Sequence, residues 1–191
     1  MILTADHGQE FREHNWFGHG KTLFNEQVKI PLIIKAGDIR KGKIGINVQH
    51  ADIFPTILDI LKIPLPYNID GTSLLGNIDF LNRPLFAEQK LDGHDLRSLL
   101  VGDSKFIHNL NDVSYLHQAR HENIFYEMFN LLKDPEEENN VVDTENVSSA
   151  YFKQRLAFEY SLLRRMFDVE SEHTDIPPEL EEKLRALGYI K

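Results

Sequence analysis

The chain opens with a short apolar run that stops abruptly at an aspartate, a histidine and a glycine. Residues 1–5 have the composition of a buried β-strand, and Asp6, His7 and Gly8 follow directly. In α/β proteins, functional groups gather just beyond the carboxyl ends of strands. We therefore expect the functional edge of an α/β sheet here. Because no element precedes this strand, we also expect the chain to be the C-terminal part of something larger.

The composition excludes several classes of protein. With 41% hydrophobic residues among 191, the chain can build a sizeable core, which excludes wholesale disorder. The balance of 21 basic against 30 acidic residues, a net charge of −9, opposes binding to nucleic acid. No apolar run approaches the ~18 residues of a membrane-spanning helix, and no signal peptide is visible. The chain has no cysteine, which excludes disulfides and thiolate metal sites but leaves the compartment open.

The order of apolar runs and turn residues predicts two parts. In the first, residues 29–35 form a second apolar strand, and residues 53–61 form a helix with Asp52 as its N-cap. The two apolar strands are nearly continuous, so we expect residues 31–35 to lie parallel to the first strand in a sheet buried on both faces. Residues 1–80 are thus expected to be the late portion of an α/β domain.

The second part, residues 81–191, has the pattern of a smaller subdomain. Four β-prone runs separated by turn residues predict an antiparallel meander, over residues 84–88, 96–101, 105–110 and 123–131. An acidic, solvated loop is expected at 134–146, a helix at 151–167, and a last short helix from Pro177 and Pro178.

Two short segments carry residues suited to chemistry. Asp6 and His7 offer one oxygen and one nitrogen ligand to a divalent metal ion, although a helix cap and a polar loop residue are the plainer interpretation. Glycine-flanked His19 and nearby Lys21 can both donate hydrogen bonds to an anionic oxygen substrate, and an imidazole can protonate a leaving group. A surface turn with a solvated lysine is the alternative. His14 is a weaker candidate.

Several segments, in order along the chain, resemble one family. They are TADHGQEF, EH and GHGKTLFNE at 4–26, IPLII at 30–34, VQHADIFPTILD at 48–59, DGTSL at 70–74, FNLLKDPEEENN at 129–140 and LRALGYI at 184–190. Together they resemble the C-terminal half of a sulfatase, a member of the alkaline-phosphatase superfamily. The resemblance implies an alkaline-phosphatase-like α/β domain followed by a small antiparallel α+β subdomain.

The resemblance also implies a site. Sulfatases use a formylglycine nucleophile made in a C/S-x-P-x-R motif of their N-terminal half, beside a divalent cation held by an early Asp-Asp pair and a later Asp-Asn or Asp-His pair. The later pair corresponds to Asp6 and His7; the histidine makes manganese or zinc competitive with calcium. His19, with Lys21 as its rival, corresponds to the residue that contacts the sulfate and the leaving oxygen. Because the chain has neither cysteine nor S-x-P-x-R, we expect it to be inactive alone.

The parent reaction implied is hydrolysis of a sulfate ester of a small molecule or glycan. The alternatives are a phosphonate or phosphodiester hydrolase, a phosphoglycerol or phosphoethanolamine transferase acting on a phosphorylated substrate, or a non-catalytic remnant or interaction module. Without an N-terminal half, the chain is expected to expose apolar sheet surface and to self-associate.

Overall fold

The computed structural model describes residues 1–37, 39, 41–67, 69–76, 82–91, 94–110, 125–167 and 178–186. These residues form two compact units, Met1–Leu156 and Ala157–Lys191. The second unit contains the end of α4 (Asn146–Phe167) and α5 (Pro178–Ala186). The expected domain boundary near residue 80 falls outside the described residues and stays a prediction.

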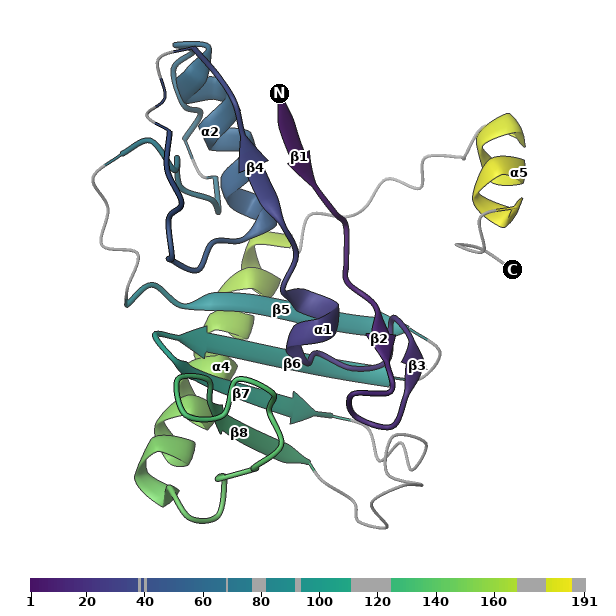
Figure 1. Ribbon diagram of the computed structural model, residues 1–191, viewed down its shortest axis with the longest axis vertical. Helices are drawn as coiled ribbons and strands as arrows, with labels where there is room; N and C mark the ends of the chain where they lie inside the picture. Colours follow the sequence, from purple (N-terminus) through teal and green to yellow (C-terminus); the bar gives the residue numbers. More distant parts are fainter. Residues whose placement is uncertain are drawn as a thin grey trace. The chain divides into compact units, whose positions relative to one another are not determined.

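A four-stranded antiparallel sheet dominates the first unit (Figure 1). Its strands follow one another in sequence order: β5 (Leu85–Leu91), β6 (His94–Val101), β7 (Ser104–Asn109) and β8 (Tyr126–Asn130). Gly102 and Asp103 form the short turn between β6 and β7, as neighbouring antiparallel strands allow. The predicted meander is therefore confirmed.

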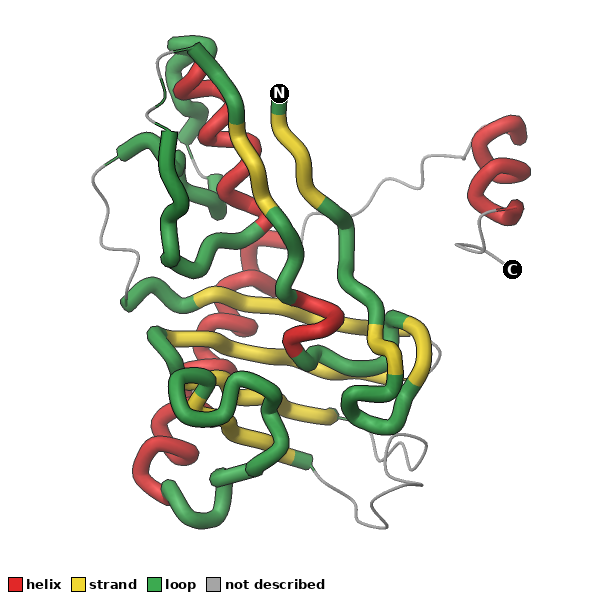
Figure 2. The backbone as a smooth tube through the Cα atoms, in the orientation of Figure 1, coloured by secondary structure: helices red, strands yellow, loops and turns green. Residues whose placement is uncertain are grey.

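Both faces of this sheet are covered, because successive side chains on a strand point to opposite faces. On one face the segment before α1 (Asn25–Val28) packs through its Leu23 and Phe24 side chains. On the other face lies the first part of α4, up to Leu156 (Figure 2). This helix begins five residues before the predicted start, at Asn146 instead of 151. The core residues of the first face are Leu23, Phe24, Leu96, Ile107 and Phe129, and those of the second are Leu99, Phe106, Met128, Phe152 and Leu156.

The N-terminal strand pair corrects one expectation. Strand β1 (Ile2–Thr4) pairs with β4 (Leu32–Ile34), but antiparallel, not parallel. A parallel pair needs a crossover that returns the chain to its starting end. The connection here holds only the small hairpin of β2 (Glu10–Phe11) and β3 (Phe17–Gly18) and the one-turn α1, and the chain runs back beside β1. The expected burial on both faces is also absent, since Leu3 is 48% and Ile33 55% exposed.

Asp52 precedes α2 (Ile53–Ile60) as expected, but its side chain does not cap that helix. It accepts the Gln49 N–H at 2.9 Å, closing a capping box around the 3₁₀ turn η1 (His50–Asp52). It also binds both terminal nitrogens of Arg83, at 2.7 and 2.6 Å. Burial raises the pKa of Asp52, but the Arg83 and backbone hydrogen bonds outweigh burial and lower it overall. Asp52 therefore serves as a buried anchor.

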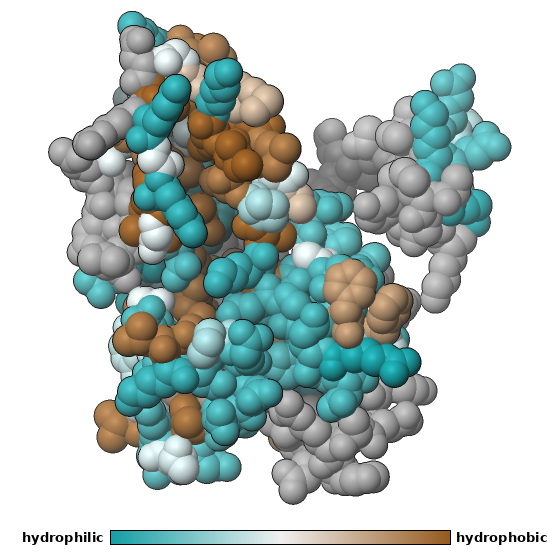
Figure 3. All heavy atoms as spheres, in the orientation of Figure 1, coloured by the Kyte–Doolittle hydropathy of each residue, from teal (hydrophilic) through white to brown (hydrophobic). Residues whose placement is uncertain are grey.

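Apolar side chains gather on the surface over β4 and α2 (Figure 3). We call the exposed set the N-terminal apolar face: Leu3, Ile33, Phe54, Ile57, Leu61 and Ile63. Among the described helices, none combines the length and the apolar character that crossing a bilayer requires.

Candidate functional site

Asp6 and His7 form a tight turn directly after β1. The His7 N–H donates to Asp6 Oδ1 at 3.0 Å, and His7 Nε2 lies 3.8 Å from Asp6 Oδ2. His7 Nδ1 lies 2.7 Å from the Gly8 carbonyl oxygen, which can only accept, so Nδ1 carries the proton and the Nε2 of a neutral ring presents its lone pair. His50 Nε2 donates to the Ala5 carbonyl at 2.8 Å and holds the end of β1.

The spacing of the Asp6 and His7 side chains allows both to bind one divalent cation. Two ligand atoms, each about 2.2 Å from one ion, can be at most about 4.4 Å apart. The 3.8 Å between Nε2 and Oδ2 lies within that limit, and both side chains are exposed. The Nδ1–carbonyl bond of His7 is the outer contact that orients a metal-binding histidine. A complete site needs further ligands, and the metal role of these two residues stays a prediction.

Gly8 lets this turn approach the backbone of α1. Its N–H donates to the Gln27 carbonyl at 2.8 Å. A Cβ at this position would lie 2.0 Å from the Glu26 carbonyl oxygen, far inside contact distance. Only glycine allows Asp6 and His7 to sit in this place.

His19 lies against His7, whereas Lys21 is directed elsewhere. The two imidazole rings stack with their centroids 4.1 Å apart, and His19 Nδ1 lies 2.9 Å from Gln9 Oε1. The Lys21 ammonium lies over the Trp16 ring, 4.1 Å from its centroid. The structure thus brings together Asp6, His7 and His19. The catalytic role expected for His19 or Lys21 remains a prediction.

A buried glutamate holds the loop that carries His19. Glu10 is fully buried, and its carboxylate accepts the N–H groups of His14 and Trp16 at 3.2 and 3.1 Å. It also accepts from the Thr22 hydroxyl at 3.2 Å and from the Gln27 amide at 3.0 Å. Four donors satisfy a buried carboxylate. Gln27 in turn accepts the Gly20 N–H at 2.9 Å, which connects this network to the residue after His19.

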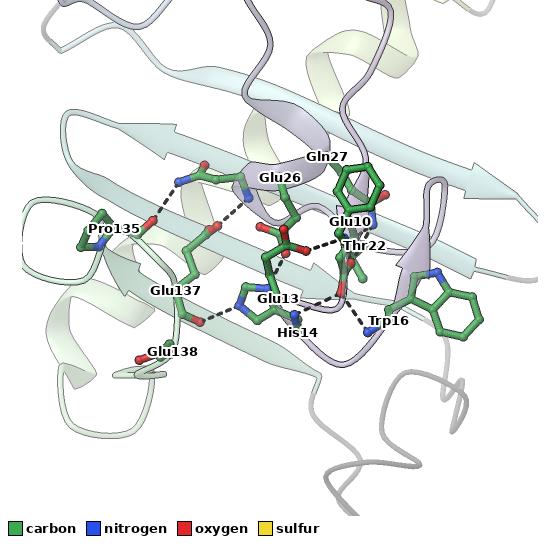
Figure 4. Close-up of polar contacts among 12 residues, drawn as sticks. Glu10, Glu13, His14, Trp16, Thr22, Glu26, Gln27, Pro135, Glu137 and Glu138 are labelled. Carbon is green, nitrogen blue, oxygen red and sulfur yellow. Dashed lines mark hydrogen bonds and ion pairs between the residues drawn. The ribbon is translucent and has the colours of Figure 1, made fainter.

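His14, the weaker candidate in the sequence, has a hydrogen-bond partner at each ring nitrogen. Its Nδ1 bonds Glu26 Oε1, and its Nε2 lies 3.1 Å from the Glu137 carbonyl oxygen (Figure 4). Its ring also stacks on that of Phe24, with the ring centroids 3.7 Å apart. Burial lowers the pKa of His14, but its contacts with Glu26 and Glu137 outweigh burial and raise the pKa above 6.5. The same hydrogen bond lowers the pKa of Glu26 against the effect of burial.

Ligand atoms of Glu10, His14 and Glu26 lie within 4.8 Å of one another, as a metal site requires. Their bonding favours a proton over a metal ion. The two ring nitrogens of His14 face a carbonyl oxygen and a carboxylate, and both nitrogens can donate only when the ring is protonated to an imidazolium. An imidazolium has no lone pair for a metal ion. The local sequence does not reveal the contact of His14 with Glu137, because the two residues lie 123 positions apart.

The acidic segment expected to be a solvated loop contains one fully buried residue, Glu137. Its Oε1 lies 2.7 Å from the Nζ of Lys105, a residue of β7. The Lys105 side chain is only 2% exposed. The Asn25 N–H donates to Glu137 Oε2 at 2.6 Å. Burial lowers the pKa of Lys105 and raises that of Glu137, against their mutual attraction.

The sequence comparisons point to one family. Residues 1–63 match the model of the sulfatase family. Arylsulfatase K of Homo sapiens is 29% identical over 154 residues, covering 74% of this chain and 27% of that protein. An arylsulfatase of Clostridium perfringens is 27% identical over 185 residues, covering 92% of this chain and 35% of that protein. The chain therefore spans about a quarter to a third of the length of these relatives.

Solved structures share the fold. A putative sulfatase from Bacteroides thetaiotaomicron superposes with a TM-score of 0.67 at 20% identity, covering 93% of this chain and 39% of that one. A protein solved in complex with its substrate D-glucosamine-2-N,6-O-disulfate superposes with a TM-score of 0.60 at 22% identity, covering 91% of this chain and 36% of that one. The fold is thus that of part of an alkaline-phosphatase-like sulfatase. The first third of the chain thus matches the sulfatase family model, and the chain as a whole is similar in sequence and fold to one part of known sulfatases.

Proposed function

We propose that this chain contributes one part of the active centre of a metal-dependent sulfate ester hydrolase, formed by Asp6, His7 and His19. The observation that carries the proposal is the stacking of His19 on His7, next to the Asp6 carboxylate. Three polar groups from two separate loops converge after β1, where an α/β protein carries its functional groups. The proposed substrate is a sulfated small molecule or glycan.

Each residue has a distinct role in this proposal. Asp6 and His7 hold a divalent cation, calcium, manganese or zinc, through the carboxylate and Nε2. Such an ion supplies positive charge that stabilises the negative charge of a sulfate ester. His19 is oriented through its Nδ1 by Gln9 and donates from Nε2 to the oxygen of the leaving alcohol. Lys21, over the Trp16 ring, is the alternative donor.

Catalysis in this proposal needs a nucleophile from outside these 191 residues, since the chain contains neither cysteine nor an S-x-P-x-R motif. The test therefore uses a protein in which this chain is joined to the nucleophile-bearing half of a sulfatase. The rate of hydrolysis of an aryl sulfate is measured for His19→Ala, Lys21→Ala and the double variant. His108→Ala is the control, because His108 stacks on Tyr126, on the sheet face that packs against α4.

Loss of the positioned donor is expected to lower kcat by about 10²-fold or more. The larger loss is expected for His19→Ala, and His108→Ala is expected to stay within a few fold of the parent. A double variant that hydrolyses the ester at nearly the parent rate would show that neither residue acts on the substrate. Turnover of a phosphonate ester without turnover of a sulfate ester would assign the chain to the phosphoryl-type relatives instead.

A further inference from the structure

The short helix α1 contacts both loops that carry the candidate site residues. Gln27 in α1 accepts two hydrogen bonds from them: its backbone carbonyl oxygen accepts the Gly8 N–H at 2.8 Å, and its side-chain Oε1 accepts the Gly20 N–H at 2.9 Å. Gly8 directly follows His7, and Gly20 directly follows His19. The placement of α1 therefore sets the placement of the two histidines relative to each other.

Glu137, on the loop after β8, holds the start of α1, although it lies 112 residues after Asn25 in the chain (Figure 4). Its Oε2 accepts the N–H of Asn25, the first residue of α1, at 2.6 Å. Its carbonyl oxygen accepts from His14, whose other ring nitrogen donates to the side chain of Glu26, the next residue of α1. Two attachments at consecutive residues restrain both the position and the rotation of this one-turn helix.

Lys105 is the counter-ion that keeps Glu137 in place. Its Nζ lies 2.7 Å from Glu137 Oε1 and donates to Asn25 Oδ1 at 3.2 Å. A buried ion pair contributes little net stability, and well-packed apolar residues of similar volume often replace one without loss. Apolar residues, however, would leave the Asn25 N–H and the Asn25 side chain without these partners. The pair is therefore better explained by what it positions than by the stability it adds.

We propose that Glu137, with Lys105 as its counter-ion, is a positioning residue that fixes α1 and through it the Asp6–His7–Gly8 turn and the His19 loop. The loop after β8 and the strand β7 thereby control the geometry of a site formed by the first twenty residues. The inference rests on the proposed function for the meaning of that site. The positioning itself is measurable without catalysis.

The experiment measures hydrogen exchange of individual backbone amides by NMR on the full chain. Glu137→Ala removes both the acceptor for Asn25 and the partner of Lys105. Lys105→Met with Glu137→Gln removes both charges but keeps a side-chain oxygen for the Asn25 N–H, and so tests rescue in a variant without an unpaired buried charge. Glu136→Gln, at the exposed preceding residue, removes one negative charge as a matched control.

Glu137→Ala is expected to accelerate exchange of the Gly8 and Gly20 amides at least about tenfold, the effect of losing one hydrogen bond to a charged group. Amides of β6 and β7 are expected to keep their rates, and the double variant to restore protection at Gly8 and Gly20. If Glu137→Ala fails to fold, Lys105→Met with Glu137→Leu replaces it, because this pair removes the acceptor for the Asn25 N–H without leaving a buried charge unpaired. Accelerated exchange at Gly8 and Gly20 alone is then the expected result.

Two results would overturn the inference: unchanged exchange at Gly8 and Gly20 in Glu137→Ala, or equal acceleration at every protected amide, which indicates a merely structural role. For Lys105→Met with Glu137→Leu, equal acceleration throughout, or wild-type exchange at the two glycines, has the same meaning. The proposed function fails separately, when His19→Ala and Lys21→Ala leave sulfate ester hydrolysis intact while the exchange result holds.

Discussion

Replacing Gly8 by alanine places a methyl group inside the backbone of α1. The added Cβ would lie 2.0 Å from the Glu26 carbonyl oxygen, 2.9 Å from the Glu26 carbonyl carbon and 3.2 Å from the Gln27 Cα. All three are backbone atoms, so no side chain can rotate away to make room. The closest of these distances must grow from 2.0 Å to at least 3.4 Å to reach ordinary contact, and the turn must move away from the helix.

The cost has two parts. Moving the turn breaks the 2.8 Å bond from the Gly8 N–H to the Gln27 carbonyl, whose net value is about 1 kcal/mol. Residual overpacking adds about 1–3 kcal/mol. We expect Gly8→Ala to lower the free energy of unfolding by about 2–4 kcal/mol, measured by urea denaturation.

Gly42 provides the matched control, since a Cβ built there meets no atom within 4 Å. Gly42→Ala is expected to be neutral or to stabilise by at most about 1 kcal/mol, because alanine reduces the entropy of the unfolded chain. If Gly8→Ala unfolded within about 0.5 kcal/mol of the parent, as a typical surface substitution does, the close packing of the turn on α1 would be refuted.

Three further results are expected. Contacts with Glu26 and Glu137 raise the folded-state pKa of His14 above 6.5, so protonated His14 stabilises the folded protein fully below pH 6.5. This stabilisation is lost as the pH rises through the raised pKa. If the difference in unfolding free energy between the parent and His14→Gln stayed the same across that pH range, this expectation would be wrong. Phe106→Ala, in the sheet core, should lower the free energy of unfolding by about 3–5 kcal/mol in the same denaturation assay. Phe158→Ala should lower it by about 0.5 kcal/mol or less, because Phe158 is 55% exposed. Sedimentation velocity at micromolar concentration should show dimers or larger species that associate through the N-terminal apolar face, and Phe54→Lys should weaken this association. A compact monomer that binds no hydrophobic dye would argue against self-association.

Local patterns predicted the parts of the fold that depend on neighbouring residues. The meander of β5 to β8 follows from β-prone runs separated by turn residues, and α2 from its 3.6-residue apolar spacing. The strand direction of β4 was mispredicted because a continuous apolar run is typical of parallel strands but does not encode direction. Direction depended on the length and content of the connection, in which one helical turn was too short for a crossover.

The candidate site divides in the same way. Asp6, His7 and His19 were found from their place after a strand and between glycines. Glu10 was missed because the hairpin inverts the usual pattern: Phe11 and Phe17 point outward at 63% exposure each, and the carboxylate points inward. Glu137 was missed because a run of acidic residues indicates a solvated loop, and its partner Lys105 lies on another strand.

We propose that a divalent cation binds at Asp6 and His7, and not at the cluster of Glu10, His14 and Glu26. Titration with Mn²⁺, followed by NMR of the histidine ring protons, tests it directly, because the paramagnetic ion broadens signals from nearby rings. The His7 and His19 signals are expected to broaden first, while the His14 signal stays sharp. Asp6→Asn is expected to abolish this selectivity. Earlier broadening of His14, or equal broadening of exposed and buried histidines, would contradict it.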